Sequence, residues 1–306
     1  MKEGDMLKIQ VPGSTANLGP GFDSVGLALN RYLTLTVKLA EKWTFKPVSE
    51  EVADIPEGQN NLIYKVATQL AEQYDVALPP CHVEVSSEIP MTRGLGSSAA
   101  AVAAGIELCN RIAQLNLSDE EKVHFASKIE GHPDNASASI VGGLIIGFLT
   151  EDRTYYVKTN KIDVDIIAVI PPYYLYTKDS RGALPDSFPF KQSVKASAVS
   201  NVLVGSLLNN NWELAGKMMD MDIFHQPYRE SLVPELKKVR EIGKENGAYG
   251  TALSGAGPTI LCFAPKGLRH SLCPRLKEAF PHCEVTQLEV DVDGMKSWFT
   301  HIESFA

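Results

Sequence analysis

Residues 90–104 constrain this chain more strongly than any other stretch. They read P-M-T-R-G-L-G-S-S-A-A-A-V-A-A, so Gly94 and Gly96 flank a leucine, and two serines open an alanine-rich segment that predicts a helix. Glycine lets the backbone adopt positive φ and approach a ligand without a Cβ in the way. The first N–H groups of a helix point outward at the positive end of its dipole. This combination predicts an anion site that fits a polyphosphate.

Two other phosphate-binding patterns fit less well. The Walker pattern needs a lysine, and this loop has none. Gly94, Gly96 and Ala99 satisfy the dinucleotide pattern G-x-G-x-x-A, but that pattern needs a strand directly before it and a βαβ unit around it. Here Pro90 separates the loop from a strand predicted over residues 81–87, and residues 117–121 open a second helix. A nicotinamide cofactor is therefore not expected.

The stretch closely resembles the P-x-x-x-G-L-G-S-S-A phosphate loop of the GHMP kinases, the superfamily of galactokinase, homoserine kinase, mevalonate kinase and phosphomevalonate kinase. The resemblance implies an α+β, two-domain fold, with an N-terminal α/β ATP-binding domain over residues 1–160 and a C-terminal ferredoxin-like domain over residues 161–306. It also implies ATP as phosphoryl donor, with Mg²⁺. The nucleotide-binding residues that it implies in this stretch are Pro90, Arg93, Gly94, Leu95, Gly96, Ser97, Ser98, Ala99 and Ala100.

Composition narrows the class of protein. The net charge of −8 argues against a nucleic-acid partner or an anionic membrane surface. No stretch is long enough to span a membrane, and the first residues lack the apolar core of a signal peptide. The five cysteines form no C-x-x-C pair and are predicted to be reduced thiols of a cytoplasmic protein. Residues that could meet around a metal, but are expected to be scattered, are His270, Cys273, His282 and Cys283.

Residues 11–26 read V-P-G-S-T-A-N-L-G-P-G-F-D-S-V-G and are too rich in glycine and proline to predict regular structure. We expect a long ordered loop that carries Asn17 and Asp23; a plain surface loop is the alternative. The segment resembles the first signature of homoserine kinases, S-A-N-L-G-x-G-F-D. Many kinases of the superfamily have a lysine where Ser14 and Thr15 stand here, which favours the homoserine branch over mevalonate kinases.

The segment H-P-D-N follows a helix that is predicted to begin with a capping box at Ser118 and Glu121. A solvated corner is one interpretation, but the apolar run V-G-G-L-I-I-G-F comes next and predicts a buried strand against which the polar group is set. The segment also resembles the H-x-D-N of homoserine kinases. That resemblance implies Glu130 as the Mg²⁺ carboxylate opposite Ser98. It further implies that the residues orienting the reacting hydroxyl are Asn17, His132 and Asn135.

Two arginines bear on the substrate. Arg181 ends Y-T-K-D-S-R, which also holds Thr177, and Arg229 ends Q-P-Y-R. An isolated arginine is ordinarily a surface residue. Both segments, however, resemble the places where homoserine kinases set arginines against the α-carboxylate, and a guanidinium offers paired donors in one plane. The same resemblance implies Asp23 as the partner of the ammonium group and Thr177 as a further substrate contact.

The remaining signals lie in the glycines of S-G-A-G-P and in the order of elements in the second half. Gly255 and Gly257 match the third signature of the family, a turn over the phosphate loop, although a simple hairpin turn is the alternative. Asn61 is either a nucleotide contact or a helix cap. Strands predicted over residues 162–170, 249–253, 259–263 and 285–290, with helices between them, give the β-α-β-β-α-β order of a split ferredoxin-like domain.

These motifs together predict a kinase of the homoserine kinase family that phosphorylates L-homoserine with Mg·ATP, and the resemblance implies a homodimer. Another small-alcohol kinase of the superfamily and a catalytically inactive nucleotide or amino-acid sensor are the alternatives. Three side chains could act as a general base, namely Asp23, His132 and Asp134. The asparagine at position 135 favours a reaction without one.

Overall fold

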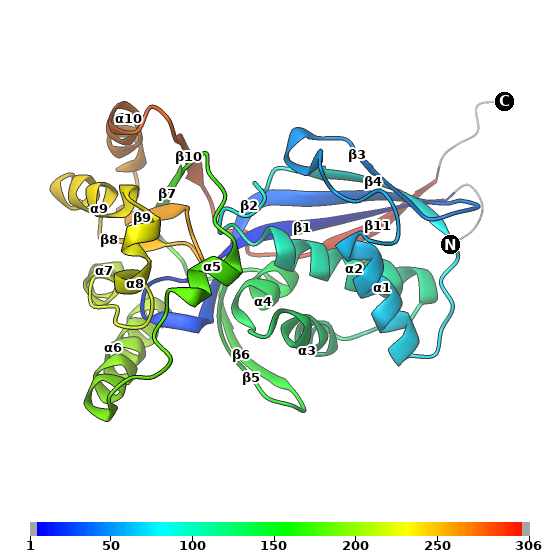
Figure 1. Ribbon diagram of the computed structural model, residues 1–306, viewed down its shortest axis with the longest axis horizontal. Coiled ribbons are helices and arrows are strands. Elements are labelled where there is room, and N and C mark those ends of the chain that lie inside the picture. Colours follow the sequence, from blue (N-terminus) through cyan, green and yellow to red (C-terminus); the bar gives the residue numbers. More distant parts are fainter. Residues whose placement is uncertain (1–4, 302–306) are drawn as a thin grey trace.

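A computed structural model describes residues 5–301, and Figure 1 shows its two lobes. The first lobe is built on a seven-stranded sheet of order β11-β1-β2-β4-β3, with β5 also paired to β2, and β6 to β5. Its strands are β1 (Asp5–Asn17), β2 (Gly21–Leu39), β3 (Thr44–Pro47), β4 (Cys81–Ser87), β5 (Leu144–Leu149), β6 (Thr154–Thr159) and β11 (Lys296–His301). Its helices are η1 (Glu50–Val52), α1 (Leu62–Gln73), α2 (Ser97–Ala113), α3 (Asp119–Glu130) and α4 (Asp134–Val141).

The second lobe is a four-stranded sheet of order β10-β7-β9-β8. Its strands are β7 (Asp165–Ile170), β8 (Gly250–Leu253), β9 (Ile260–Ala264) and β10 (Glu284–Leu288). Its helices are α5 (Thr177–Gly182), α6 (Phe190–Leu208), α7 (Trp212–Met219), α8 (Gln226–Arg229), η2 (Glu230–Leu232), α9 (Glu235–Glu245) and α10 (Arg269–Ala279). The strand order and the intervening helices confirm the predicted ferredoxin-like arrangement. A division between domains at residue 160 stays a prediction. The last strand, β11, follows that residue in the sequence but pairs with β1 of the first lobe.

The prediction of a loop over residues 11–26 was wrong. β1 and β2 form a long antiparallel hairpin there, whose tip reaches the second lobe. Register shifts after Pro12 and after Ala16, with positive φ at Asn17, bend the strands without breaking their pairing. Small residues allow close packing on this hairpin: a Cβ at Gly26 would stand 2.1 Å from the Asp134 carbonyl oxygen. Glycine here serves close approach between elements rather than a loop.

The helix start and the strand around H-P-D-N follow the predictions, but a short helix between them was not foreseen. The capping box at Ser118 and Glu121 is present, and α3 ends at Glu130 with Gly131 as its C-cap. H-P-D-N then leads directly into α4, which packs against β1 and β2. The predicted buried strand follows as β5. Across residues 5–301, no helix has both the length and the apolar character needed to cross a membrane.

Candidate active site

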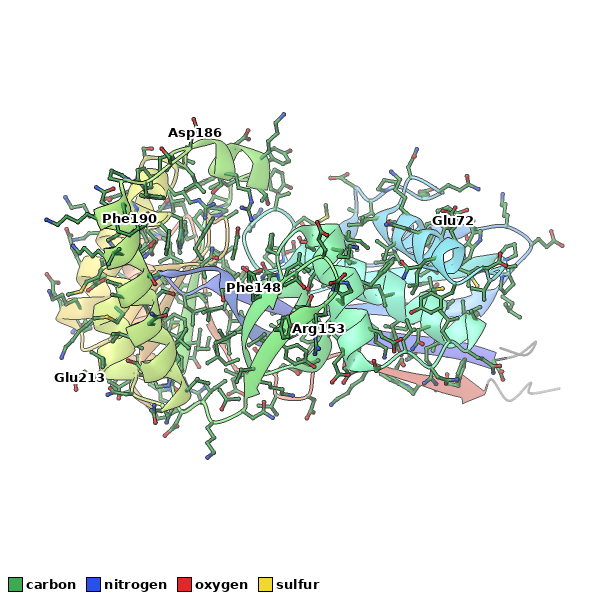
Figure 2. The ribbon with its side chains drawn as sticks, turned by 90° about the horizontal axis from the view of Figure 1, so that it is seen from below. Glu72, Phe148, Arg153, Asp186, Phe190 and Glu213 are labelled. Carbon is green, nitrogen blue, oxygen red and sulfur yellow. The ribbon has the colours of Figure 1, made fainter. Side chains whose placement is uncertain are left out.

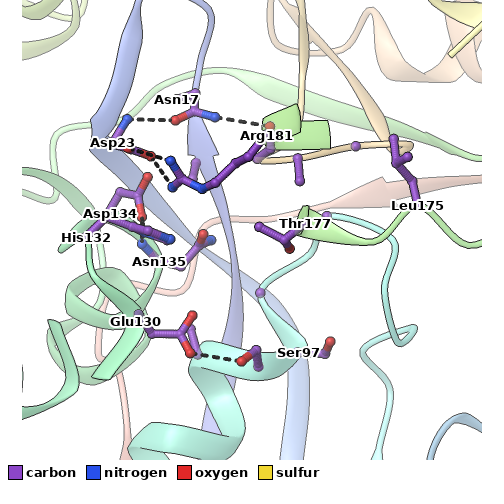
Figure 3. A pocket seen from close by; sticks show the side chains of 18 of the residues that line it. Asn17, Asp23, Ser97, Glu130, His132, Asp134, Asn135, Leu175, Thr177 and Arg181 are labelled. Carbon is purple, nitrogen blue, oxygen red and sulfur yellow. Dashed lines mark hydrogen bonds and ion pairs between the residues drawn. The ribbon is translucent and has the colours of Figure 1, made fainter. Parts of the chain in front are cut away.

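A cavity of about 330 Å³ is lined by residues of both lobes (Figure 3). The predicted site residues that line it are Asn17, Asp23, Gly94, Gly96, Ser97, Ser98, Ala99, Glu130, His132, Asn135, Thr177, Arg181, Arg229, Gly255 and Gly257. The predicted residues outside its lining are Asn61, Pro90, Arg93, Leu95 and Ala100. Asp134, one of the three possible general bases, also lines it, and the lining residues without a predicted role are Ala16, Phe22, Thr92, Ile129, Leu175 and Ala256. Segments distant in the sequence therefore converge on one cavity.

The glycine-rich loop forms the wall that leads into α2. Gly94 and Gly96 have φ of +79° and +75°, which L side chains rarely adopt. A Cβ would also collide at both positions, 2.3 Å from the Ser254 carbonyl oxygen at Gly94 and 2.4 Å from Ser14 Oγ at Gly96. Gly96 is the N-cap of α2, so the first N–H groups of that helix open toward the cavity at Ser97 and Ser98. This geometry suits an anion.

The predicted nucleotide residues outside the lining have structural contacts. The Asn61 side chain accepts the Ile63 N–H at 2.9 Å and caps α1, which matches the helix-cap alternative. Leu95 and Ala100 are buried in the larger hydrophobic core. Arg93 extends toward the second lobe, where Nη2 donates to the Pro172 carbonyl oxygen at 3.2 Å. Any role of these residues in binding the nucleotide stays a prediction.

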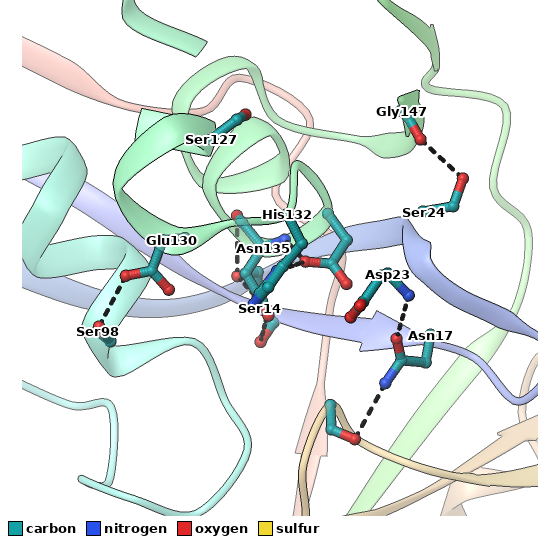
Figure 4. Close-up of polar contacts among 12 residues, drawn as sticks. Ser14, Asn17, Asp23, Ser24, Ser98, Ser127, Glu130, His132, Asn135 and Gly147 are labelled. Carbon is teal, nitrogen blue, oxygen red and sulfur yellow. Dashed lines mark hydrogen bonds and ion pairs between the residues drawn. The ribbon is translucent and has the colours of Figure 1, made fainter. Parts of the chain in front are cut away.

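Ser98 and Glu130 meet at the mouth of α2 (Figure 4). Ser98 Oγ donates to Glu130 Oε1 at 2.8 Å. Burial raises the pKa of the Glu130 carboxyl above its usual value, although the Ser98 hydrogen bond opposes this. Within residues 5–301, no lysine or arginine forms an ion pair with Glu130. The Ser98 hydroxyl and the Glu130 carboxylate, beside an anion site, fit a hard cation such as Mg²⁺.

His132, Asp134 and Asn135 form a connected group at the start of α4. His132 Nδ1 donates to Asp134 Oδ1 at 2.6 Å, and the same oxygen accepts the Asn135 N–H at 2.6 Å. Burial alone would lower the pKa of His132, but the hydrogen bond and negative charge of Asp134 outweigh it and raise the pKa. Asn135 Nδ2 donates to Ser14 Oγ at 3.0 Å, which fixes the amide plane. Asn135 lines the cavity, and its Oδ1 receives no hydrogen bond from residues 5–301.

Asn17 and Asp23 come from the β1–β2 hairpin and face the second lobe. Asn17 Oδ1 accepts the Asp23 N–H at 3.0 Å, while Nδ2 donates to the Gly255 carbonyl oxygen at 3.1 Å. The Asp23 carboxylate binds Arg181 through two hydrogen bonds of 3.0 and 2.7 Å. The hairpin, α5 and the Gly255 turn are thus joined by polar contacts across the two lobes.

Arg229 is almost fully buried, with 2% of its surface exposed. Its Nε donates to the Ser180 carbonyl oxygen at 3.2 Å, and Nη1 donates to the Gly255 carbonyl oxygen at 3.0 Å and to His225 Nδ1 at 3.2 Å. Burial lowers the pKa of His225 to about 4, so its ring is neutral and accepts at Nδ1 while Nε2 donates to the Gly19 carbonyl oxygen. Burial also lowers the Arg229 pKa to about 10, which leaves the guanidinium charged at neutral pH.

Phe22 was overlooked as a site residue. The Arg181 and Arg229 guanidinium carbons lie 5.6 and 5.4 Å from its ring centroid, and His225 stacks on it at 5.3 Å. The ring is thus within cation–π distance of both guanidinium groups. Its place in the G-F-D of the first signature was the signal that could have found it. Leu175 and Thr92 gave no such signal, because they meet only through a backbone hydrogen bond of 3.2 Å between distant segments.

Comparisons with known proteins agree with this geometry. A family model described as the GHMP kinases N terminal domain matches residues 61–143, and one described as GHMP kinases C terminal matches residues 203–282. The chain is 55% identical over 296 residues to a homoserine kinase of Bacillus pumilus, with 96% of each chain covered. It is 51% identical over 290 residues to a homoserine kinase of Halalkalibacterium halodurans, with 94% of each covered.

Solved structures give the same result. A homoserine kinase from Cytophaga hutchinsonii superposes with a TM-score of 0.85 at 25% identity, covering 97% of this chain and 98% of that one. A candidate homoserine kinase from Listeria monocytogenes superposes with a TM-score of 0.83 at 42% identity, covering 95% and 99%. A mevalonate kinase shares the fold, with a TM-score of 0.70 at 15% identity, covering 93% and 99%. The chain therefore belongs to the homoserine kinase family of the GHMP kinases.

Proposed function

We propose that this chain transfers the γ-phosphoryl group of Mg·ATP to the side-chain hydroxyl of L-homoserine, giving O-phospho-L-homoserine for threonine biosynthesis. One observation carries the proposal. A single cavity has an anion-binding helix start on one wall, and on another an aspartate with two arginines that suit both ends of an α-amino acid. The relatives named homoserine kinase support the same function.

The phosphates of ATP would lie against the glycine-rich loop and the start of α2. Backbone N–H groups there offer donors that need no reorganisation when the anion arrives. Ser98 and Glu130 would hold Mg²⁺, which when bound neutralises charge on the phosphates. The carboxylate is free to bind such an ion, since no lysine or arginine of residues 5–301 forms an ion pair with it.

The amino-acid end of homoserine would bind between the lobes. Arg181 and Arg229 would bind the α-carboxylate and Asp23 the ammonium group, with Thr177 beside them. Arg181 and Asp23 satisfy each other in the described structure. A bound zwitterion would replace each partner of that ion pair with a group of the same charge, so its two charges would remain neutralised.

The transfer itself demands orientation more than acid–base chemistry. Phosphoryl transfer passes through a loose transition state in which little charge develops on the attacking oxygen. Asn135 Oδ1 would accept the hydroxyl hydrogen of homoserine, while Asn17 and His132 complete the wall around it. Binding both reactants in one cavity between the lobes would also bring them together at high effective concentration.

The decisive experiment is an ADP-release assay with homoserine, serine, mevalonate and galactose. We expect homoserine to be turned over far faster than the compounds that lack an α-amino or α-carboxyl group. Equal turnover of mevalonate or galactose would instead identify another small-alcohol kinase. No ADP release with any of the four, alongside measurable ATP binding, would identify a sensor.

We further propose a cytoplasmic homodimer. The cysteines of the chain are all unpaired, which fits a reducing compartment. Phe148 on β5 and Phe190 on α6 are 67% and 85% exposed and lie on the face seen in Figure 2, where a second copy could cover them. Light scattering should give twice the mass of one chain, and a monomer at micromolar concentration would overturn the dimer.

A further inference from the structure

A second cluster of ligating side chains lies in the second lobe and shares no residue with the cavity. Glu235 begins α9, while His282 and Cys283 stand just before β10. One ligand atom from each lies within 4.8 Å of the others. His282 and Cys283 were expected to be scattered residues, and the group that joins them is a glutamate from another segment. His270 and Cys273 do not take part in this cluster.

Among residues 5–301, the Glu235 carboxylate pairs with a histidine but with no lysine or arginine. Only 8% of its side chain is exposed, and its contacts are the Tyr173 hydroxyl and the His282 ring. No lysine or arginine of residues 5–301 forms an ion pair with it. The positive end of the α9 dipole offsets only part of such a charge. Buried carboxylates are normally paired with a cation or bound to a metal.

The donor set and its spacing favour one class of metal. His282 Nε2 and Glu235 Oε1 are 3.2 Å apart. That separation is close to the ~3.3 Å between two ligands on a tetrahedral ion with bonds of about 2.0–2.1 Å. A nitrogen, an oxygen and a sulfur ligand together suit Zn²⁺, whereas Mg²⁺ and Ca²⁺ prefer oxygen alone. His282 is 53% exposed, so an ion has a route from solvent and a place for a bound water.

Tyr173 supports the arrangement from outside. Its hydroxyl donates to Glu235 Oε2 at 2.7 Å, which leaves Oε1 directed at His282. Hydrogen bonds of this kind hold metal ligands in place in known sites. We propose that Glu235, His282 and Cys283 form a Zn²⁺ site, with Tyr173 orienting the carboxylate and water as fourth ligand. The ion would join the start of α9 to the turn before β10. Tyr173, through its hydrogen bond to Glu235, connects this site to the segment that leads to Leu175 in the cavity.

The test uses the full chain after chelator treatment, with Zn²⁺ followed by calorimetry and Co²⁺ followed by absorption. We expect one equivalent to bind and a thiolate-to-cobalt charge-transfer band to develop. His282→Asn and Cys283→Ser should each abolish the band. Tyr173→Phe should keep it and weaken binding by about 10–100-fold. Circular dichroism should show that each variant is folded. Because His282 is exposed, its replacement should not disturb the fold.

Two controls separate this site from others. His270→Asn, on the exposed face of α10, should bind Co²⁺ like the wild type, and Glu130→Gln should keep the band because it alters only the proposed Mg²⁺ site. A band that survives Cys283→Ser would assign the thiolate to another cysteine and overturn the proposal. Wild-type affinity no greater than that of His282→Asn would overturn it as well.

Discussion

Arg181 and Asp23 form a two-point ion pair that joins α5 to the β1–β2 hairpin, with Nη1–Oδ2 and Nη2–Oδ1 distances of 3.0 and 2.7 Å. Their side chains are 39% and 35% exposed, so water reaches the pair. An ion pair of this exposure adds little to stability. Its groups are therefore available to a ligand at small cost.

Arg181→Ala should consequently weaken substrate binding more than folding. We expect the KM for homoserine to rise more than tenfold, because losing a charged hydrogen-bonding partner costs about 1.5–3 kcal/mol. The KM for ATP should stay nearly unchanged, and the free energy of unfolding should fall by less than about 1 kcal/mol. Steady-state kinetics and urea unfolding measure these quantities.

Arg153→Ala is a matched control, since this exposed arginine lies between β5 and β6 and lines no part of the cavity. Its kinetics should equal those of the wild type. An ATP KM that rises in Arg181→Ala as much as the homoserine KM would place Arg181 in the nucleotide site.

Arg229→Ala should differ from Arg181→Ala in its effect on folding. Arg229 is buried and donates to two carbonyl oxygens and His225, so its loss leaves buried acceptors unpaired. Leaving one such group unpaired costs about 1–3 kcal/mol of folding free energy. We therefore expect the free energy of unfolding to fall by at least that amount and the homoserine KM to rise. Urea unfolding of both variants makes the comparison. Equal stabilities would show that the cavity side of Arg229 is wetter than the structure indicates.

Ser98→Ala and Glu130→Gln should each lower kcat and shift the Mg²⁺ titration to higher concentration. Burial raises the pKa of Glu130, so its carboxylate begins to protonate at a higher pH than an ordinary glutamate. The Mg²⁺ requirement of the wild type should therefore increase as the pH falls toward that value, and this dependence should vanish in Glu130→Gln. An unchanged Mg²⁺ titration in Glu130→Gln would move the metal ligand to Asp134.

The residues that line the cavity were easier to predict from the sequence than the backbone elements that carry them. The motifs located the glycine loop, Glu130 and both arginines, because these residue types carry their chemistry locally. The hairpin of β1 and β2 was not predictable, since its glycines serve contacts with α4 and with the loop, which are distant in the sequence. The Arg181–Asp23 pair was missed for the same reason. Each residue was expected to contact the substrate, and only the fold shows that they contact each other.

His132 should make stability depend on pH in a defined direction. Its folded pKa is raised above the ordinary 6.5, so its pair with Asp134 contributes fully below about pH 6.5 and is lost as pH rises through the folded pKa. The stability difference between wild type and His132→Gln should thus be larger at about pH 6 than at about pH 9. His124 is the control: burial lowers its pKa, so the difference between wild type and His124→Gln should change in the opposite direction. A His132→Gln difference that does not vary with pH would show that folding leaves the His132 pKa unchanged and would contradict the raised pKa.

The last prediction concerns the proton of the homoserine hydroxyl. With homoserine bound, Asp23 would bind the ammonium group, and buried Asp134 accepts from His132 and from the Asn135 N–H at Oδ1, so we expect neither aspartate to take that proton. Asn135 cannot accept it either, but its fixed amide can orient the hydroxyl, and in a loose transition state the proton leaves late. We expect Asn135→Ala to lower kcat and Asp23→Asn to act mostly on the homoserine KM. The kcat profile between roughly pH 6 and 9 should have no acid limb that one substitution removes. An acid limb that disappears with nearly all turnover in Asp23→Asn or Asp134→Asn would identify that aspartate as the base.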